Sequence, residues 1–171
     1  DREISGASTN CRIRVINTQG AAININGVVV QPGNIQSIAG NATCADSGNG
    51  GAATVAGLGN PVSLFADAGG NLYFTQGTPT RVRVINTQPG ATTFNGILIQ
   101  PGNIAVVAGG GVALNDGGPA TAAQLTNPQG LFVDPGGVLY IADIGVSRVR
   151  KVIAGGTIST VAGTGTATFN G

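Results

Sequence analysis

The sequence predicts an all-β protein made of about two and a half copies of one unit, each unit a four-stranded antiparallel sheet. Three observations lead to this prediction: the chain repeats itself, short apolar runs alternate with turns rich in Gly, Pro and Asn, and almost no segment has a helical period. Self-similarity at a long period is the mark of a repeat architecture. The repeated segments are RIRVINTQ (12–19) with RVRVINTQ (81–88), QPGNI (31–35) with QPGNI (100–104), and SLFADAGGNLYF (63–74) with GLFVDPGGVLYI (130–141).

The first two strands of each unit are predicted to form a tight hairpin. In the clearest copy, GLFVD (130–134) and VLYIAD (138–143) flank the sequence Pro-Gly-Gly at 135–137. Proline fixes φ for a turn and glycine supplies positive φ, so these residues can join the two runs tightly. The segment 63–74 repeats the pattern around a turn at 67–70.

The third strand of each unit carries the pattern Arg-x-Arg, in which x is Val or Ile. An alternation of period two places both arginines on one face of a strand and the β-branched residues on the other. We expect the arginines to form structural ion pairs with recurring acids on neighbouring strands; a basic strip that binds a ligand is the alternative. The arginines are Arg12, Arg14, Arg81, Arg83, Arg148 and Arg150, and the expected partners are Asp67, Asp134 and Asp143.

Two of the three copies contain an additional hairpin after this strand. AININGVVVQPG (22–33) and TTFNGILIQPG (92–102) each place Asn-Gly between alternating apolar segments. Asn-Gly is a strong hairpin signal because a type I′ turn needs two consecutive residues with positive φ. The third copy runs directly from RVRKVI (148–153) to TISTVAG (157–163), so the hairpin is an insertion of 13 residues into a simpler unit.

Each unit closes with a strand that ends in Ala-Gly, followed by a Gly-rich loop. Residues 120–125 are expected to form one helical turn in that loop, and Asn127-Pro128 ends it before the next strand. The chain therefore divides into three parts. Residues 1–60 form an N-terminal half unit with a hairpin insertion and a Gly-rich loop, 61–127 a second unit with an insertion, and 128–171 a third unit with a C-terminal tail.

The run DGGPATAAQLTNPQGLFVDPGGVLYIADIGVSRVRKVIAGGTISTVAGTG (116–165) resembles the NHL-repeat family of β-propellers, in particular bacterial NHL-like repeat proteins. The resemblance implies that each unit is a propeller blade and that the protein is a recognition scaffold, since members of the family bind proteins, RNA or small ligands and some related propellers are enzymes. The first copy departs from the pattern, because Thr75-Gln76 replaces Ala142-Asp143. This departure argues against a general chemical role for Asp143.

Two and a half blades are too few to close, because propellers have four to eight blades. We expect the chain to complete its sheets with further copies of itself, since unpaired strand edges bind other strands. A closed ring of subunits, an open head-to-tail filament and a fragment of a longer repeat protein are the alternatives. The tail, in which ATFNG (167–171) echoes TTFNG (92–96), supplies candidate self-association residues: Thr164, Thr166, Thr168 and Phe169.

The composition argues against several classes of function. The chain has no His, which excludes His-based triads and His metal sites, and its net charge of +1 gives no basic surface for nucleic acid. No apolar run approaches the length of a membrane span. Asp46 and Asp116 lie in loops that faintly resemble calcium loops but lack the full set of acidic ligands, and the Gly-rich stretch 109–118 lacks the features of a phosphate loop. We expect no cofactor, no metal and no catalytic residue.

Two cysteines and one sequon favour an extracellular location. Cys11 and Cys44 are predicted to form a disulfide, which would stabilise the fold by roughly 3–4 kcal/mol by restricting the unfolded chain; two buried free thiols are the alternative. Asn41-Ala42-Thr43 is the single N-glycosylation sequon, and the Thr-rich tail is a weaker candidate for O-glycosylation.

Three functional hypotheses follow. The first is a non-enzymatic extracellular structural protein that self-associates, for example as a fibre subunit. The second is an NHL-type propeller module, or a fragment of one, that recognises a protein or a glycan. The third, a lyase or hydrolase on a propeller scaffold, lacks a convergent set of polar residues.

Overall fold

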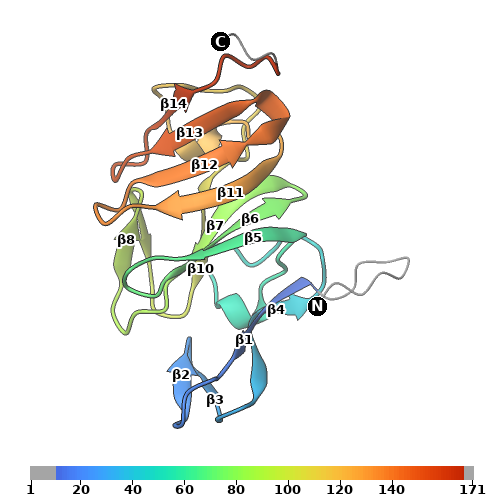
Figure 1. The fold of residues 1–171 in the computed structure, drawn as a ribbon, viewed down its shortest axis with the longest axis vertical. Coiled ribbons are helices and arrows are strands. Elements are labelled where there is room, and N and C mark those ends of the chain that lie inside the picture. Colours follow the sequence, from blue (N-terminus) through green and yellow to red (C-terminus); the bar gives the residue numbers. More distant parts are fainter. Residues whose placement is uncertain (1–10, 168–171) are drawn as a thin grey trace.

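The structure is a computed structural model that describes residues 11–167. It is all-β, as predicted. Three main antiparallel sheets follow one another along the long axis in sequence order (Figure 1), and each of the two inserted hairpins forms a further two-stranded sheet. The sheets do not close into a barrel within the described residues. The first sheet contains β1 (Cys11–Ile16) and β4 (Ile35–Ala42), and the third contains β11 (Pro128–Val133), β12 (Leu139–Asp143), β13 (Arg148–Val152) and β14 (Ile158–Ala162).

The second sheet has the strand order β10-β7-β6-β5, which matches the order of the third sheet read from its last strand. Its strands are β5 (Pro61–Ala66), β6 (Leu72–Gly77), β7 (Thr80–Ile85) and β10 (Ile104–Ala108). The inserted hairpins are β2–β3 (Ile23–Ile25 and Val28–Val30) and β8–β9 (Thr92–Phe94 and Ile97–Ile99).

Turn chemistry sets the register of the hairpins. Asn95 and Gly96 have φ of 47° and 82°, the positive values that the Asn-Gly pattern predicted, and Asn26 and Gly27 are similar at 56° and 77°. In the β11–β12 turn, Asp134 accepts hydrogen bonds from the backbone N–H groups of Gly136 and Val138, and this fixes the turn.

The expected helical turn is present as a 3₁₀ turn at Ala120–Ala122. Two further 3₁₀ turns, Ala53–Val55 and Ile144–Val146, were not predicted. Their three-residue length explains why, because so short a segment has no measurable helical period.

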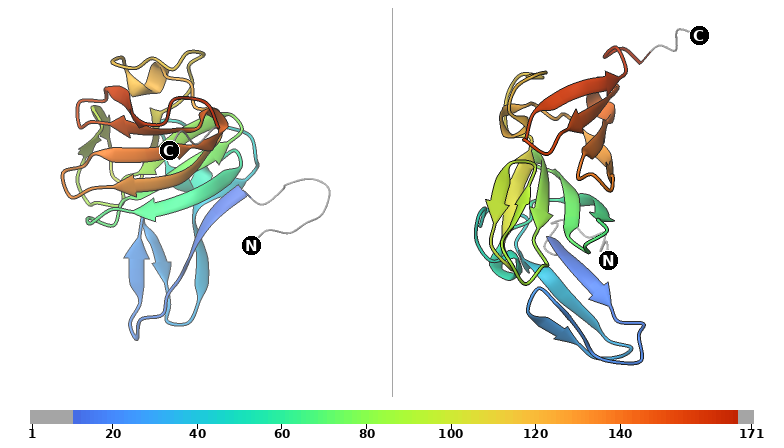
Figure 2. Two further views of the ribbon diagram at one scale, coloured as in Figure 1. Left: turned by 45° about the horizontal axis from the view of Figure 1, so that its top comes forward. Right: turned by 90° about the vertical axis from the view of Figure 1, so that its left-hand side faces the viewer.

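The core lies between successive sheets, which follow one another in the right-hand view of Figure 2. We call the face of a sheet that is turned toward the preceding sheet its N-side face, and the opposite one its C-side face. On β7, Arg83 and Ile85 lie on the N-side face and contact the first sheet and its loop, whereas Val82 and Val84 lie on the C-side face in the core shared with the third sheet.

Candidate self-association site

Strand β1 has an open edge within the described residues. In the third sheet, β13 lies between β12 and β14, and in the second sheet β7 lies between β6 and β10. The repeat makes β1 the counterpart of β7 and β13, yet among residues 11–167 β1 pairs with β4 alone (Figure 1). In this part of the chain the first sheet therefore has two strands, whereas each of the two other sheets has four.

A cavity of about 360 Å³ lies beside this open edge. It separates β1 and the inserted hairpin β2–β3 from the β5–β6 hairpin of the second sheet. Its apolar lining consists of Ile13, Val15, Ile25, Ile38, Leu64 and Leu72, and Arg14, Asn24 and Gln88 contribute polar groups.

The second sheet is incompletely covered on the side of this cavity. Leu72 is only half-buried, whereas its counterpart in the third sheet, Leu139, is 0% exposed. Leu64 is 52% exposed, whereas its counterpart Leu131 packs against the core. Leu64, Leu72 and the open edge of β1 lie where the first sheet has no counterparts of β5 and β6 among residues 11–167. The apolar lining could bury the side chains of an added strand.

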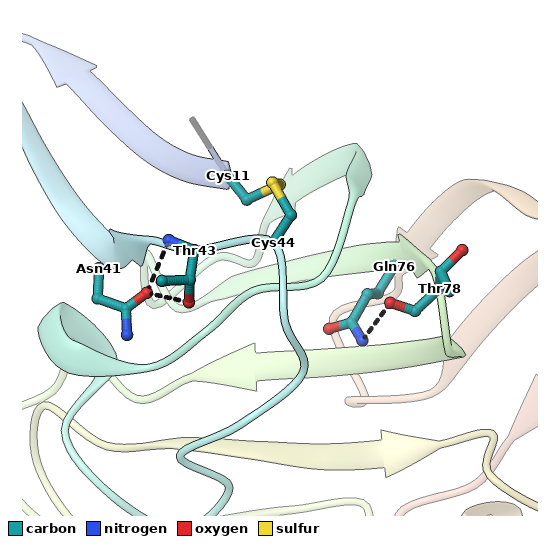
Figure 3. Close-up of a disulfide and its surroundings, with 6 residues drawn as sticks. All are labelled: Cys11, Asn41, Thr43, Cys44, Gln76 and Thr78. Carbon is teal, nitrogen blue, oxygen red and sulfur yellow. Dashed lines mark hydrogen bonds between the residues drawn. A yellow bond between two sulfur atoms is a disulfide. The ribbon is translucent and has the colours of Figure 1, made fainter. Parts of the chain in front are cut away.

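The disulfide between Cys11 and Cys44 is present and ties the start of β1 to the segment that follows β4 (Figure 3). The two Cα atoms are 5.1 Å apart, within the usual range for a disulfide. The bridge holds together a sheet that has only one strand pair, and it is consistent with an oxidising, extracellular location.

The predicted sequon lies beside this bridge, at the end of β4. Asn41 and Thr43 are both exposed. The hydroxyl of Thr43 donates to Oδ1 of Asn41 at 2.7 Å, and the backbone N–H of Thr43 donates to the same oxygen at 2.9 Å (Figure 3). The amide nitrogen of Asn41 donates to the carbonyl of Val55.

The arginines do form ion pairs, but the predicted acidic partners were wrong. Arg81 and Arg83 both contact Asp46, at 2.5 and 3.5 Å, and Arg150 contacts Asp116 at 2.6 Å. Both acids lie in the loops that connect successive sheets. The guanidinium groups of Arg83 and Arg150 therefore reach into the loop ahead of their own sheet and do not pair across neighbouring strands.

The same arginines also hold the backbone of these loops. Arg83 donates to the carbonyls of Ser47 and Gly57, and Arg150 donates to the carbonyl of Leu114. Leu114 and Ser47 occupy the same position in the repeat, so the contact to the loop backbone is repeated although the acidic residue is not. Among residues 11–167, the remaining arginines of the pattern form no ion pair with a carboxylate: Arg12, Arg14 and Arg148.

The three acids expected to bind arginine stabilise turns and loops. Asp67 accepts from the N–H groups of Gly69 and Asn71 in its own turn, as Asp134 does in the third sheet. Asp143 is fully buried and accepts from the N–H groups of Thr126 and Asn127, just ahead of β11. Short acidic side chains after a strand bind the nearest free N–H groups more readily than a distant guanidinium, which explains the error.

Burial and neighbouring charges shift the pKa values of three side chains in and near these networks. Burial lowers the pKa of Arg83, and the charge of Asp46 opposes that effect. Burial acts to raise the pKa of Asp116, but its interactions with Thr160 and the Arg150 guanidinium outweigh it, so the pKa of this carboxyl lies below its usual value. Burial together with the charge of Asp67 raises the pKa of the Tyr73 hydroxyl. These shifts belong to structural networks in the loops and sheets.

Only part of the predicted self-association tail lies in the described chain. The hydroxyls of Thr164 and Thr166 are 2.8 Å apart on the exposed surface, and the carbonyl of Thr164 accepts from Arg148. Thr168 and Phe169 lie outside the described residues. The described part of this tail, residues 164–167, does not line the cavity beside β1. Sequence reasoning did not predict that cavity.

Within residues 11–167, no group of three or more His, Cys, Asp or Glu side chains gathers in a way that could hold a metal ion. Over the same part of the chain, no helix is sufficiently long and apolar to span a membrane.

No family model matches the chain. A stretch of 69 residues is 42% identical to teneurin-4 of Mus musculus and covers 36% of this chain and 2% of that protein. A longer stretch of 102 residues is 36% identical to teneurin-3 of Danio rerio and covers 55% of this chain and 4% of that protein. Teneurin-4 of Homo sapiens is 41% identical over 69 residues, again 36% of this chain and 2% of the relative.

The chain thus spans only a few per cent of the length of these curated relatives. Its internal repeats and its strands make it a repeat-containing, β-rich protein that is similar to a short part of each.

Proposed function

We propose that this chain is a non-enzymatic, extracellular structural protein that self-associates through its open strand edge and forms head-to-tail fibres. The observation that carries the proposal is the two-stranded first sheet, whose edge strand β1 lies next to an apolar cavity. An unpaired edge presents N–H and C=O groups that another strand can satisfy, and the cavity offers burial for its side chains.

The arrangement of the polar residues supports a structural role. The buried charges Arg83, Arg150 and Asp143 are bound to loop carbonyls, loop N–H groups or carboxylates, and so serve the scaffold. The disulfide supports the extracellular location, because such bonds persist in oxidising compartments.

The test is the mass and shape of the assembly. Light scattering and electron microscopy of the purified chain over a range of concentrations should show growth into elongated particles. Discrete monomers at the highest concentration would contradict the proposal.

A substitution in the cavity tests whether the edge of β1 is used. Val15→Lys places a charge in the apolar lining and should weaken association about tenfold or more, because an unpaired charge resists burial. Val29→Lys, at a 54% exposed position of the inserted hairpin, is the matched control and should associate as the unmodified chain does. Equal association of the two variants would argue against this edge.

An NHL-type binding module that recognises a protein or a glycan is the second candidate. It is favoured by the resemblance of residues 116–165 and by the blade-like, four-stranded third sheet. In microscopy it would give compact closed rings in place of elongated particles.

We also propose that Asn41 carries an N-linked glycan. The sequon is exposed, and the Thr43 hydroxyl already contacts the side-chain amide of Asn41. Intact mass of the secreted chain before and after enzymatic deglycosylation, with Thr43→Ala as the variant that destroys the sequon, tests this; an unshifted mass in material from a glycosylating source would contradict it.

A further inference from the structure

The two contacts between successive sheets reuse the same positions of the repeat. Between the second and third sheets, Val82 and Val84 of the C-side face are buried against Val152 of the N-side face, and all three are 0% exposed. Other buried positions at this contact include Tyr73, Ala105 and Val107 on one side and Leu139, Arg150 and Ile158 on the other.

The N-side face of the first sheet carries the same kinds of residue but is uncovered. Ile16 and Ile35 lie directly opposite each other on β1 and β4 and are 61% and 43% exposed. Their counterparts in the second sheet, Ile85 and Ile104, are 1% and 0% exposed. Arg14 is likewise exposed, whereas Arg83 and Arg150 at its position are fully buried.

The C-side face of the third sheet is uncovered in the same way. Val161 is 47% exposed, whereas its counterpart Val107 is 0% exposed. Tyr140 and Val149 are half-buried, whereas Tyr73 and Val82 are buried. Two positions differ in chemistry, since Lys151 replaces Val84 and Ser159 replaces Ala105.

We propose that the C-side face of the third sheet of one copy stacks on the N-side face of the first sheet of a second copy. This inference rests on the proposed self-association and adds to it a second contact, between two sheet faces, beside the pairing at the edge of β1. The occupant is a second copy because the same pair of faces already forms both contacts between sheets inside the chain. Stacking these faces continues that series across the boundary between copies.

The geometry of this contact is heterologous, because two different faces meet. After the first contact forms, the pair of copies still has one uncovered N-side face and one uncovered C-side face, so association continues and gives an open filament or a ring. Lys151 and Ser159 make the contact less apolar than the contacts within the chain. The contact should therefore form reversibly and depend on concentration.

Sedimentation velocity of the full chain tests the proposal with one variant on each face. Ile16→Glu and Val161→Glu should each raise the concentration needed for association about tenfold or more, because each buries an unpaired carboxylate. Val112→Glu, at a 92% exposed loop position outside both faces, is the control and should leave association unchanged. Circular dichroism checks that each variant is folded.

A variant that should strengthen association provides a second test, which still applies if Ile16→Glu or Val161→Glu fails to fold. Lys151→Val restores the residue type of Val84 and should lower the concentration needed for association, and adding Ile16→Glu should remove that gain. If the unmodified chain never associates, the proposed function itself fails. If it associates, but Ile16→Glu, Val161→Glu and Lys151→Val all behave like the control, self-association stands and the stacking of these faces is wrong.

Discussion

The first and the third sheets are built from the same repeated segments, yet they differ in how fully they are formed. The third sheet has four paired strands and an N-side face on which Leu139, Arg150 and Val152 are fully buried. Among residues 11–167, the first sheet has one strand pair, an open edge and an N-side face on which Ile16 and Ile35 are exposed. The first sheet has a disulfide, which the third lacks. The same repeated strand, β1 in the first sheet and β13 in the third, is thus stabilised in two ways. Strands on both sides stabilise β13, whereas β1 is stabilised by β4 and by the disulfide.

The largest difference should appear when the disulfide is removed. Cys11→Ser with Cys44→Ser is expected to lower the free energy of unfolding by roughly 3–4 kcal/mol, because the closed loop no longer restricts the unfolded chain. Hydrogen exchange should show faster exchange in β1 and β4 and unchanged exchange in β12 and β13. Uniformly faster exchange across all sheets would mean that the sheets unfold as one unit.

The second arginine of each Arg-x-Arg pattern gives a matched series. Arg83→Met should cost about 3 kcal/mol in chemical denaturation, because it leaves loop carbonyls and Asp46 without their buried cationic partner. Arg14→Met should change stability by less than about 0.5 kcal/mol in the monomer, because Arg14 is exposed. Equal losses at the two positions would contradict the difference in burial on which the comparison depends.

The inserted hairpin β8–β9 contacts the third sheet through the side chain of Asn95. Nδ2 of Asn95 lies 3.3–3.5 Å from the carbonyls of Gly137, Val152 and Ile153, and the residue has positive φ. Asn95→Ala should cost about 1–2 kcal/mol in thermal or chemical unfolding, because it removes these contacts and places alanine in the left-handed region. Asn95→Gly, which tolerates that backbone, separates the two causes and should cost less.

The smallest effect concerns pH. The pKa of Asp116 is lower in the folded chain than in the unfolded chain, so its contribution to stability is complete above the unfolded value, near 4, and is lost as the pH falls through the folded value. Asp116→Asn should therefore flatten the decline of stability below about pH 4 and leave its slope near neutral pH unchanged. Denaturation at several pH values measures this; an identical acid decline in both proteins would argue against the assignment.

The sequence predicted the elements that depend on local chemistry. Asn-Gly at 26–27 and 95–96 identified both inserted hairpins, and Pro-Gly-Gly at 135–137 identified a turn, because positive φ is a property of few residue types. The disulfide was predictable because Cys11 and Cys44 are the only two cysteines of the chain.

Contacts between distant segments were harder to predict. Asp46 and Asp116 lie more than 30 residues from the arginines that they bind, and no sequence period relates them. The cavity beside β1 depends on how the first sheet packs against the second, which repeat counting does not give. The repeat did identify β1 as the counterpart of β7 and β13, and among residues 11–167 β1 has one paired neighbour where those strands have two.

The most direct test of self-association through β1 is hydrogen exchange of the full chain at a low and a high concentration. The amides of residues 12–16 in β1 should exchange more slowly when the chain is concentrated, because another chain pairs with the edge. The amides of β13 (Arg148–Val152), already paired on both sides, should not change. Exchange in β1 that is the same at both concentrations, in a sample that has associated, would contradict self-association through β1.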